Sequence, residues 1–179
     1  MGRTVFTLAL IILGAVVFLV VGGILAALLF AQQTSIQPSV KTVNEKVWTI
    51  KVYDLSEKTV DLSNYKGKVL IIDFFATWCG PCVKQIEELK KLLASRSDVH
   101  VVSISISPAT DTPEKLNKFI KDHKITWPVY IDKNRDMVKL FDISAIPTLV
   151  IIGPKGKYVV RVGFTEYKVL SKLIDSVKE

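Results

Sequence analysis

The chain has 179 residues, of which 24 are Lys or Arg, 17 are Asp or Glu, two are Cys and 49% are apolar. This length is typical of one domain with its own buried core, and the composition excludes wholesale disorder. Two cysteines exclude a disulfide-dense scaffold and a closed four-cysteine zinc site. Arg3 is the only charged residue before Lys41, so residues 41–179 form a soluble unit with a net charge of +6.

The first predicted element is a membrane-spanning helix. Residues 5–31 include no charged side chain among 27 residues, and a spanning helix needs about 20 apolar residues. The alternative is a cleaved signal peptide, whose apolar region is only about 7–15 residues long. Leu29 also occupies the position where cleavage after Ala31 requires a small residue. The predicted division is an uncleaved anchor over residues 1–31, which contacts membrane lipid through residues 5–31, a linker over 32–44 and one domain over 45–179.

The flanking charges predict the orientation of this anchor. Arg3 lies on the amino-terminal flank, and the next basic residue is Lys41, ten residues after the apolar run. Cytoplasmic flanks of membrane helices are enriched in Lys and Arg. We therefore expect a single-pass protein of the cell membrane whose soluble domain is extracytoplasmic.

The elements after the linker alternate between strands and helices. Val47–Tyr53 alternates apolar and polar residues, which predicts a half-buried strand, and a polar hairpin-like stretch follows as far as Gly67. Val69–Phe75 is almost continuously apolar, as in strands buried on both faces of a sheet. The later elements are a helix over 81–95, a strand over 99–106, a helix opened by residues 111–114, a strand over 128–131, one or two helical turns at 137–141, strands over 148–152 and 158–162, and a helix over 166–177.

This order of elements predicts an α/β domain with one core. Gly153–Gly156 is a hairpin signal, so the two strands beside it are expected to be antiparallel. The earlier strands alternate with helices, which is typical of parallel pairing. We therefore expect a mixed central sheet with helices on both faces.

The predicted chemistry lies at Cys79 and Cys82, the only cysteines of the chain. They begin the helix that follows a buried strand, where unpaired backbone N–H groups and the helix dipole lower the pKa of a thiol. Pro81 suits the first helical turn, and Gly80 allows the tight bend before it. We expect Cys79 to be exposed and to attack substrates, and Cys82 to be more buried and to resolve the adduct.

Two other interpretations of the cysteine pair are open. A zinc site needs two further ligands, and His100 and His123 lack a ligand-like spacing. Two inert buried cysteines are the second alternative, which a Gly-Pro insert at a strand-to-helix junction disfavours. We therefore predict no metal and no cofactor other than a redox-active disulfide between Cys79 and Cys82.

Two motifs carry a family resemblance. Asp73–Cys82 (DFFATWCGPC) resembles the active-site segment of thioredoxins, and Ala145–Thr148 (AIPT) resembles their cis-proline loop. A hairpin ending in residues 61–68 and an extra helix and strand at about 111–131 are similar to membrane-tethered TlpA/ResA-type thiol–disulfide oxidoreductases. The resemblance, over about residues 45–178, implies a thioredoxin-like fold with an N-terminal hairpin and a central helix–strand insertion. It also implies protein disulfides or dithiols as substrates, and an upstream electron donor such as a membrane thiol carrier.

The same resemblance assigns roles to an aspartate and a proline. Asp73 stands where thioredoxins keep a buried aspartate, whose pKa desolvation raises so that it accepts the proton of Cys82. The alternative is a structural aspartate paired with a buried lysine or water. Pro147, preceded by Ile146, is expected to have a cis peptide opposite Cys79 and to leave backbone groups free for an extended substrate. The alternative is a trans proline in an ordinary turn.

The expected substrate surface surrounds the cysteines. Trp78 either shields one side of the disulfide and offers a flat contact surface, or it belongs to the core. The residues expected to contact substrate are Trp78, Gly80, Pro81, Ile146 and Pro147.

The sequence departs from the pattern of the tethered relatives at Gly80, where many of them carry another residue, and from the family pattern at two further places. Gln85 stands where some tethered relatives have a glutamate, and the strand over 99–106 lacks the lysine that thioredoxins pair with their aspartate. The Pro-x-x-x-Thr/Ser-x-x-Cys pattern of peroxiredoxins is also absent before Cys79, which disfavours a peroxidase.

Three functions fit this sequence. The leading hypothesis is a membrane-anchored reductase of extracytoplasmic protein disulfides. The alternatives are an oxidase or isomerase that forms or shuffles disulfides, and a non-enzymatic thioredoxin-like adaptor, which the retention of both cysteines disfavours. No motif supports nucleic-acid binding.

Overall fold

The computed structural model describes residues 18, 22–23 and 40–178. The chain divides into two units, Met1–Gln37 and Pro38–Glu179, and the elements below belong to the second. No helix in the described part of the chain is long and apolar enough to cross a membrane. The predicted anchor lies almost entirely outside the described residues.

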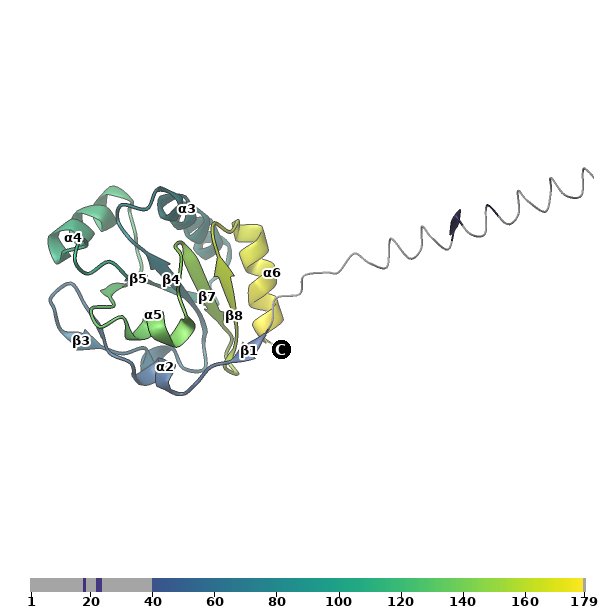
Figure 1. Cartoon of the computed structure of the whole chain (residues 1–179), viewed down its shortest axis with the longest axis horizontal. Coiled ribbons are helices and arrows are strands. Elements are labelled where there is room, and N and C mark those ends of the chain that lie inside the picture. Colours follow the sequence, from purple (N-terminus) through teal and green to yellow (C-terminus); the bar gives the residue numbers. More distant parts are fainter. Residues whose placement is uncertain (1–17, 19–21, 24–39, 179) are drawn as a thin grey trace, which may run out of the picture. The chain divides into compact units, whose positions relative to one another are not determined.

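One mixed sheet forms the centre of the second unit (Figure 1). Its eight strands are β1 (Lys41–Thr42), β2 (Val52–Tyr53), β3 (Thr59–Val60), β4 (Val69–Phe75), β5 (Val99–Ser105), β6 (Val129–Ile131), β7 (Thr148–Ile152) and β8 (Lys157–Val162). Their order in the sheet is β1-β8-β7-β4-β5-β6-β2-β3. β4 is therefore central, with parallel β5 on one side and antiparallel β7 on the other.

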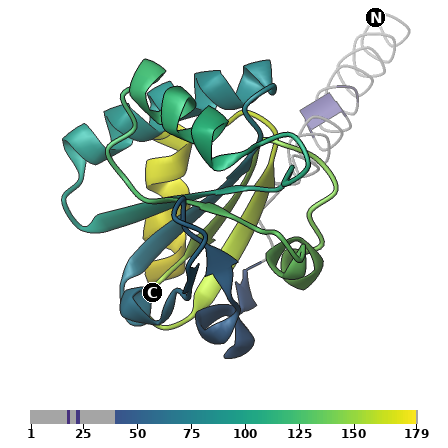
Figure 2. The ribbon, with the colours of Figure 1, turned by 90° about the vertical axis from the view of Figure 1, so that its left-hand side faces the viewer.

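Helices cover both faces of this sheet. The helical segments are α2 (Lys46–Thr49), the 3-10 turn η1 (Ser63–Tyr65), α3 (Gly80–Ser95), α4 (Pro113–Asp122), α5 (Asp136–Phe141) and α6 (Tyr167–Lys178). Buried side chains of α3, α4 and α6 form a core with one face of the sheet, and those of α2 and α5 form a core with the other. Figure 2 shows α6 (yellow) and α5 (green) on opposite sides of the strands. The predicted mixed sheet between two layers of helices is confirmed.

The sequence of β4 explains how the sheet presents a site to α3. All seven residues of β4 are buried, and Asp73 is its only polar side chain. Ile71 and Phe75 belong to the core beneath α3 and α6, whereas Ile72 and Phe74 belong to the core beneath α2 and α5. Alternate side chains of a strand point to the same face. Asp73 therefore lies on the α3 side of the sheet.

The elements predicted from residue 69 onward agree with the structure. The boundaries of β4 and β7 match the prediction. Those of β5, β6, β8, α3 and α5 differ from it by one residue at one end, and those of α6 by one residue at both ends. The N-terminal hairpin is the antiparallel pair of β2 and β3, and α4 with β6 forms the central insertion. Thr112 is the cap residue of α4, and Pro113 stands in its first turn.

The strand predicted over residues 47–53 is wrong in its first half, which forms α2. Val47 and Trp48 are adjacent, and a strand would direct them to opposite faces. In the structure both are buried in the same core, which a helical turn permits. The Asn44 carboxamide oxygen accepts a hydrogen bond from the Lys46 N–H at 2.9 Å where α2 begins. In addition, part of the predicted linker pairs with β8 and forms β1.

Candidate active site

Cys79 and Cys82 form a disulfide at the start of α3. Cys79 is the cap residue of the helix, and its sulfur accepts a hydrogen bond from the Cys82 N–H at 3.2 Å. Pro81 stands in the first turn, as expected, where its missing N–H leaves no hydrogen bond unmade. The sequence therefore places a sulfur at the positive end of the α3 dipole, where a thiolate is stabilised.

Cys79 is more exposed than Cys82, as predicted, but it is much less exposed than expected. Cys82 is 1% exposed and Cys79 is 5% exposed, so the expectation of an exposed Cys79 is wrong for the disulfide form. The Cys79 sulfur is engaged in the disulfide and in the cap of α3, and its side chain packs in the core beneath that helix. Cys79 is nevertheless the more exposed residue of the pair.

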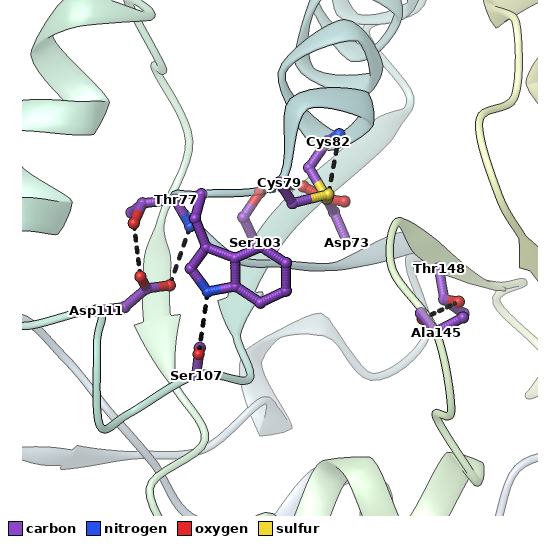
Figure 3. The surroundings of a disulfide bond; sticks show 10 residues. Asp73, Thr77, Cys79, Cys82, Ser103, Ser107, Asp111, Ala145 and Thr148 are labelled. Atoms are coloured by element: carbon purple, nitrogen blue, oxygen red, sulfur yellow. Dashed lines mark hydrogen bonds between the residues drawn. A yellow bond between two sulfur atoms is a disulfide. The ribbon is translucent and has the colours of Figure 1, made fainter.

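Trp78 lies outside the core, which excludes the alternative of a core tryptophan. Its side chain is 66% exposed, and the indole N–H donates to the Ser107 hydroxyl at 3.3 Å (Figure 3). Gly80 and Pro81 are exposed beside it. An exposed aromatic ring therefore adjoins the disulfide, held at its polar edge by one hydrogen bond.

Asp73 is buried beneath the first turn of α3, as predicted. It is 1% exposed, and Figure 3 shows its side chain beside the disulfide. Desolvation raises the pKa of Asp73 to about 7, and a hydrogen bond from the Ser103 hydroxyl to Oδ2, at 2.8 Å, opposes this shift. The partner of Asp73 is therefore a serine and not the lysine of the structural alternative. The other oxygen, Oδ1, has no hydrogen-bond partner among the described residues.

The proline loop lies at the same end of the sheet as the disulfide. The Ile146–Pro147 peptide is cis, as the resemblance implies. β7 runs antiparallel to β4 and pairs Thr148 with Phe74, so the residues just before β7 meet the end of β4 that leads to Cys79. Pro147 is buried and Ile146 is half-buried. The Pro147 carbonyl accepts the Gly163 N–H at 2.7 Å, which anchors the loop to the strand beyond it.

Asp111 is a residue of the site that was not predicted from the sequence. Residues 111–114 open a helix, as expected, but Asp111 itself is fully buried and holds the loop that precedes Cys79. Its carboxylate accepts the Thr77 N–H at 3.1 Å and the Thr77 hydroxyl at 2.6 Å (Figure 3). It also accepts the Ser105 hydroxyl at 2.6 Å. Asp111 therefore fixes the backbone two residues before Cys79. A contact across 34 residues leaves no periodic signal in the sequence.

Gln85 clamps α3 to the turn before α6. Its side chain is fully buried, donates to the Thr165 carbonyl at 3.0 Å and accepts the Thr165 N–H at 2.8 Å. One turn further along α3, Glu88 accepts the Tyr167 N–H at 2.9 Å at the start of α6. A neutral amide suits the Gln85 position because the Thr165 backbone presents one donor and one acceptor, whereas an ionised glutamate only accepts.

These features together define a thioredoxin-like disulfide centre: a Cys-Gly-Pro-Cys disulfide at a helix start, a buried carboxyl on the central strand and a cis-proline loop. The AhpC/TSA family model matches residues 43–161, and the chain belongs to this family. The predicted TlpA/ResA-like membership of the thioredoxin superfamily is confirmed.

Named relatives are of the ResA type. "Thiol-disulfide oxidoreductase ResA" of Bacillus thuringiensis subsp. konkukian is 31% identical over 108 residues, which are 60% of this chain and 62% of the relative. A ResA of Bacillus cereus is 28% identical over 153 residues, which are 86% and 82% of the two chains. A secreted Mycobacterium tuberculosis disulfide oxidoreductase homologous to E. coli DsbE superposes with a TM-score of 0.64 at 15% identity, over 74% of this chain and 99% of that chain. The structural likeness shows the fold alone.

Proposed function

We propose that this chain is a thiol–disulfide oxidoreductase that reduces disulfides in other proteins through a Cys79–Cys82 dithiol. The observation that carries the proposal is the disulfide in the first turn of α3 beside the buried carboxyl of Asp73. The name of the relatives supports the same class of activity.

The reaction begins with both cysteines reduced. The Cys79 thiolate attacks one sulfur of a substrate disulfide, so a Cys79–substrate disulfide forms and the other substrate sulfur leaves as a thiolate. Cys82 then attacks the Cys79 sulfur, which closes the enzyme disulfide and releases the second substrate sulfur. The substrate gains two electrons and two protons, and the enzyme loses them. A dithiol donor must then reduce the enzyme, and we propose a membrane thiol carrier for this step.

Asp73 is the proposed acceptor for the proton of Cys82. A general base works best when its pKa lies near the operating pH, and burial raises the pKa of Asp73 to about 7. Near neutrality an appreciable fraction of Asp73 is therefore ionised and still basic enough to take a thiol proton. The reverse reaction uses the protonated form, which returns the proton to the Cys82 thiolate as it leaves.

The proposed substrate surface consists of the residues that adjoin the disulfide. Trp78 offers an exposed aromatic face, and Gly80 and Pro81 leave the approach to Cys79 free of large polar side chains. Ile146 and Pro147 lie on the loop that meets the end of β4. An extended polypeptide suits this surface, because backbone pairing along such a loop is largely independent of substrate sequence.

The direction of the reaction is tested by the reduction potential of the Cys79–Cys82 couple, measured in the full chain against glutathione. A reductase is expected near the thioredoxin value of about −270 mV, and a strong disulfide oxidant lies near about −120 mV. A potential close to the oxidant value would replace the reductase with an oxidase or isomerase.

We also propose that residues 5–31 anchor the chain in the cell membrane with the domain outside. The uncharged apolar run and the position of Arg3 support this arrangement. In intact cells, a membrane-impermeant thiol reagent is expected to label Cys79 after mild reduction. A chain with Arg3→Glu and added lysines after the run serves as the inverted control. Labelling of the natural chain only after lysis would place the domain in the cytoplasm.

A further inference from the structure

We propose that Ser103 and Trp127 are positioning residues that hold Oδ2 of the Asp73 carboxylate, so that Oδ1 is the oxygen that exchanges a proton with Cys82. This inference rests on the proposed function, in which Asp73 takes and returns the proton of Cys82. It assigns a chemical task to the central insertion, because Trp127 lies between α4 and β6.

Two buried hydrogen bonds link Trp127 to Asp73 through Ser103. The Trp127 indole N–H donates to the Ser103 hydroxyl oxygen at 2.9 Å, and Ser103 lies 2.8 Å from Oδ2 of Asp73. An indole N–H only donates, so Ser103 must accept from it. When Asp73 is ionised it can only accept, so the hydroxyl hydrogen of Ser103 is directed to Oδ2. Ser103 and Asp73 are each 1% exposed and Trp127 is 8% exposed, so these two hydrogen bonds are shielded from bulk water.

This direction distinguishes the two carboxyl oxygens of Asp73. Oδ2 receives the Ser103 hydrogen, so a second hydrogen on Oδ2 would face it at close range. Oδ1 is buried and has no hydrogen-bond partner in the described part of the chain. In the ionised carboxylate Oδ1 is therefore the oxygen that is open to an incoming proton. When Cys82 attacks the Cys79 sulfur, the S–H bond of Cys82 breaks and its proton forms the O–H bond at Oδ1. In the reverse step, the O–H bond breaks as the Cys82 thiolate leaves.

Few charged or titratable groups surround Asp73. α3 contributes Cys79 and Cys82, and the neighbours of Asp73 in the sheet are Ser103 on β5 and Leu149 on β7. Arg161 on β8 lies opposite Leu149, two strands away from Asp73. It is the charged residue among these cross-strand neighbours. The Ser103 hydroxyl is therefore the polar contact that stabilises the carboxylate against desolvation, and its effect is to lower the pKa of Asp73.

The test separates the Cys82 step from the Cys79 step in the full reduced chain. Reaction with 5,5′-dithiobis(2-nitrobenzoate) releases one chromophore when Cys79 attacks and a second when Cys82 resolves the adduct; the chain has no other cysteine. The second phase is recorded by stopped flow from about pH 5 to about pH 10, which brackets the titration of both groups. The natural chain is expected to show an inflection near the pKa of Asp73, about 7, and Asp73→Asn is expected to remove it.

Ser103→Ala is expected to move this inflection upward by about one pH unit, because a hydrogen bond to a charged group is lost. The rate of the second phase is then expected to fall about five-fold at pH 7 and to recover at pH 9. A variant that only loses packing contacts would not recover its rate at higher pH. Trp127→Phe is expected to move the inflection upward by a smaller amount than Ser103→Ala, because the Ser103 hydroxyl is then free to rotate. Ser103→Thr keeps the hydroxyl and the inflection. The matched control is Ser105→Ala, a buried serine on the same strand that donates to Asp111, and it is expected to leave the inflection in place.

An unshifted inflection in both Ser103→Ala and Trp127→Phe would overturn the inference while leaving the proposed function intact. If Ser103→Ala lacks a cooperative unfolding transition, Trp127→Phe and Ser103→Thr decide by the same criterion. Retention of the inflection in Asp73→Asn is a separate failure, because it removes Asp73 from the proposed reaction altogether.

Discussion

Cys82→Ser is expected to convert the enzyme into a trap for its substrates. Cys79 retains its place at the start of α3 and still attacks, but the adduct loses the thiol that resolves it. Turnover is expected to fall to the background rate, and partner proteins are expected to accumulate as disulfide-linked adducts. Non-reducing gels of cells that express the variant measure this accumulation, and mass spectrometry of the adducts identifies the partners.

Cys79→Ser is the matched control for this trap. Cys82 is 1% exposed against 5% for Cys79, so the remaining thiol is expected to form almost no adducts. Equal trapping by the two variants would contradict the division of labour between the cysteines. The absence of adducts in both would favour a thioredoxin-like adaptor.

Asp73→Asn is expected to slow disulfide exchange at neutral pH by about 100- to 10,000-fold, the range for a lost general base. The asparagine keeps the shape of the side chain and its contact with Ser103 but accepts no proton from a thiol. Exchange with a small disulfide, followed from about pH 5 to about pH 9, measures the effect. A rate–pH profile that matches the natural chain would reduce Asp73 to a structural residue.

The same substitution is expected to change how stability depends on pH. The pKa of Asp73 is raised to about 7 in the folded chain, against about 3.9 in an unfolded chain. Between these values the unfolded chain loses the proton first, so the free energy of unfolding falls as pH rises from about 4 to about 7. Relative to Asp73→Asn, the natural chain is expected to lose on the order of 4 kcal/mol over this window. Denaturant unfolding of the oxidised chains at about pH 4 and about pH 8 measures the difference, and parallel profiles would contradict it.

Local patterns were sufficient to predict most of the domain. The uninterrupted apolar run of β4 indicates burial on both faces, and the structure buries all seven residues. The spacing of apolar residues after Cys82 predicts α3, whose buried face packs on the same core. The site could be identified from two motifs, the Cys-Gly-Pro-Cys sequence at this junction and the proline of the AIPT loop. Each motif consists of residues that are adjacent in the sequence.

Features that depend on distant contacts were not predictable in this way. α2 forms because burial of adjacent Val47 and Trp48 in one core outweighs the alternating pattern of that segment. Asp111 lies just before a predicted helix, and only the fold brings it to Thr77, 34 residues earlier in the chain. Ser103 has no charge to suggest a partner for Asp73, although its register opposite that residue on the parallel strand makes the contact unavoidable once β4 and β5 pair.

The Cys79–Cys82 pair is expected to catalyse the reduction of protein disulfides. The most direct measurement is the reduction of insulin by dithiothreitol, followed by the turbidity of the released chains, with the full chain present at catalytic concentration. The natural chain is expected to shorten the lag and accelerate precipitation, and Cys79→Ser is expected to match dithiothreitol alone. A natural chain that does no better than dithiothreitol, or a Cys79→Ser chain that does as well as the natural one, would contradict the account.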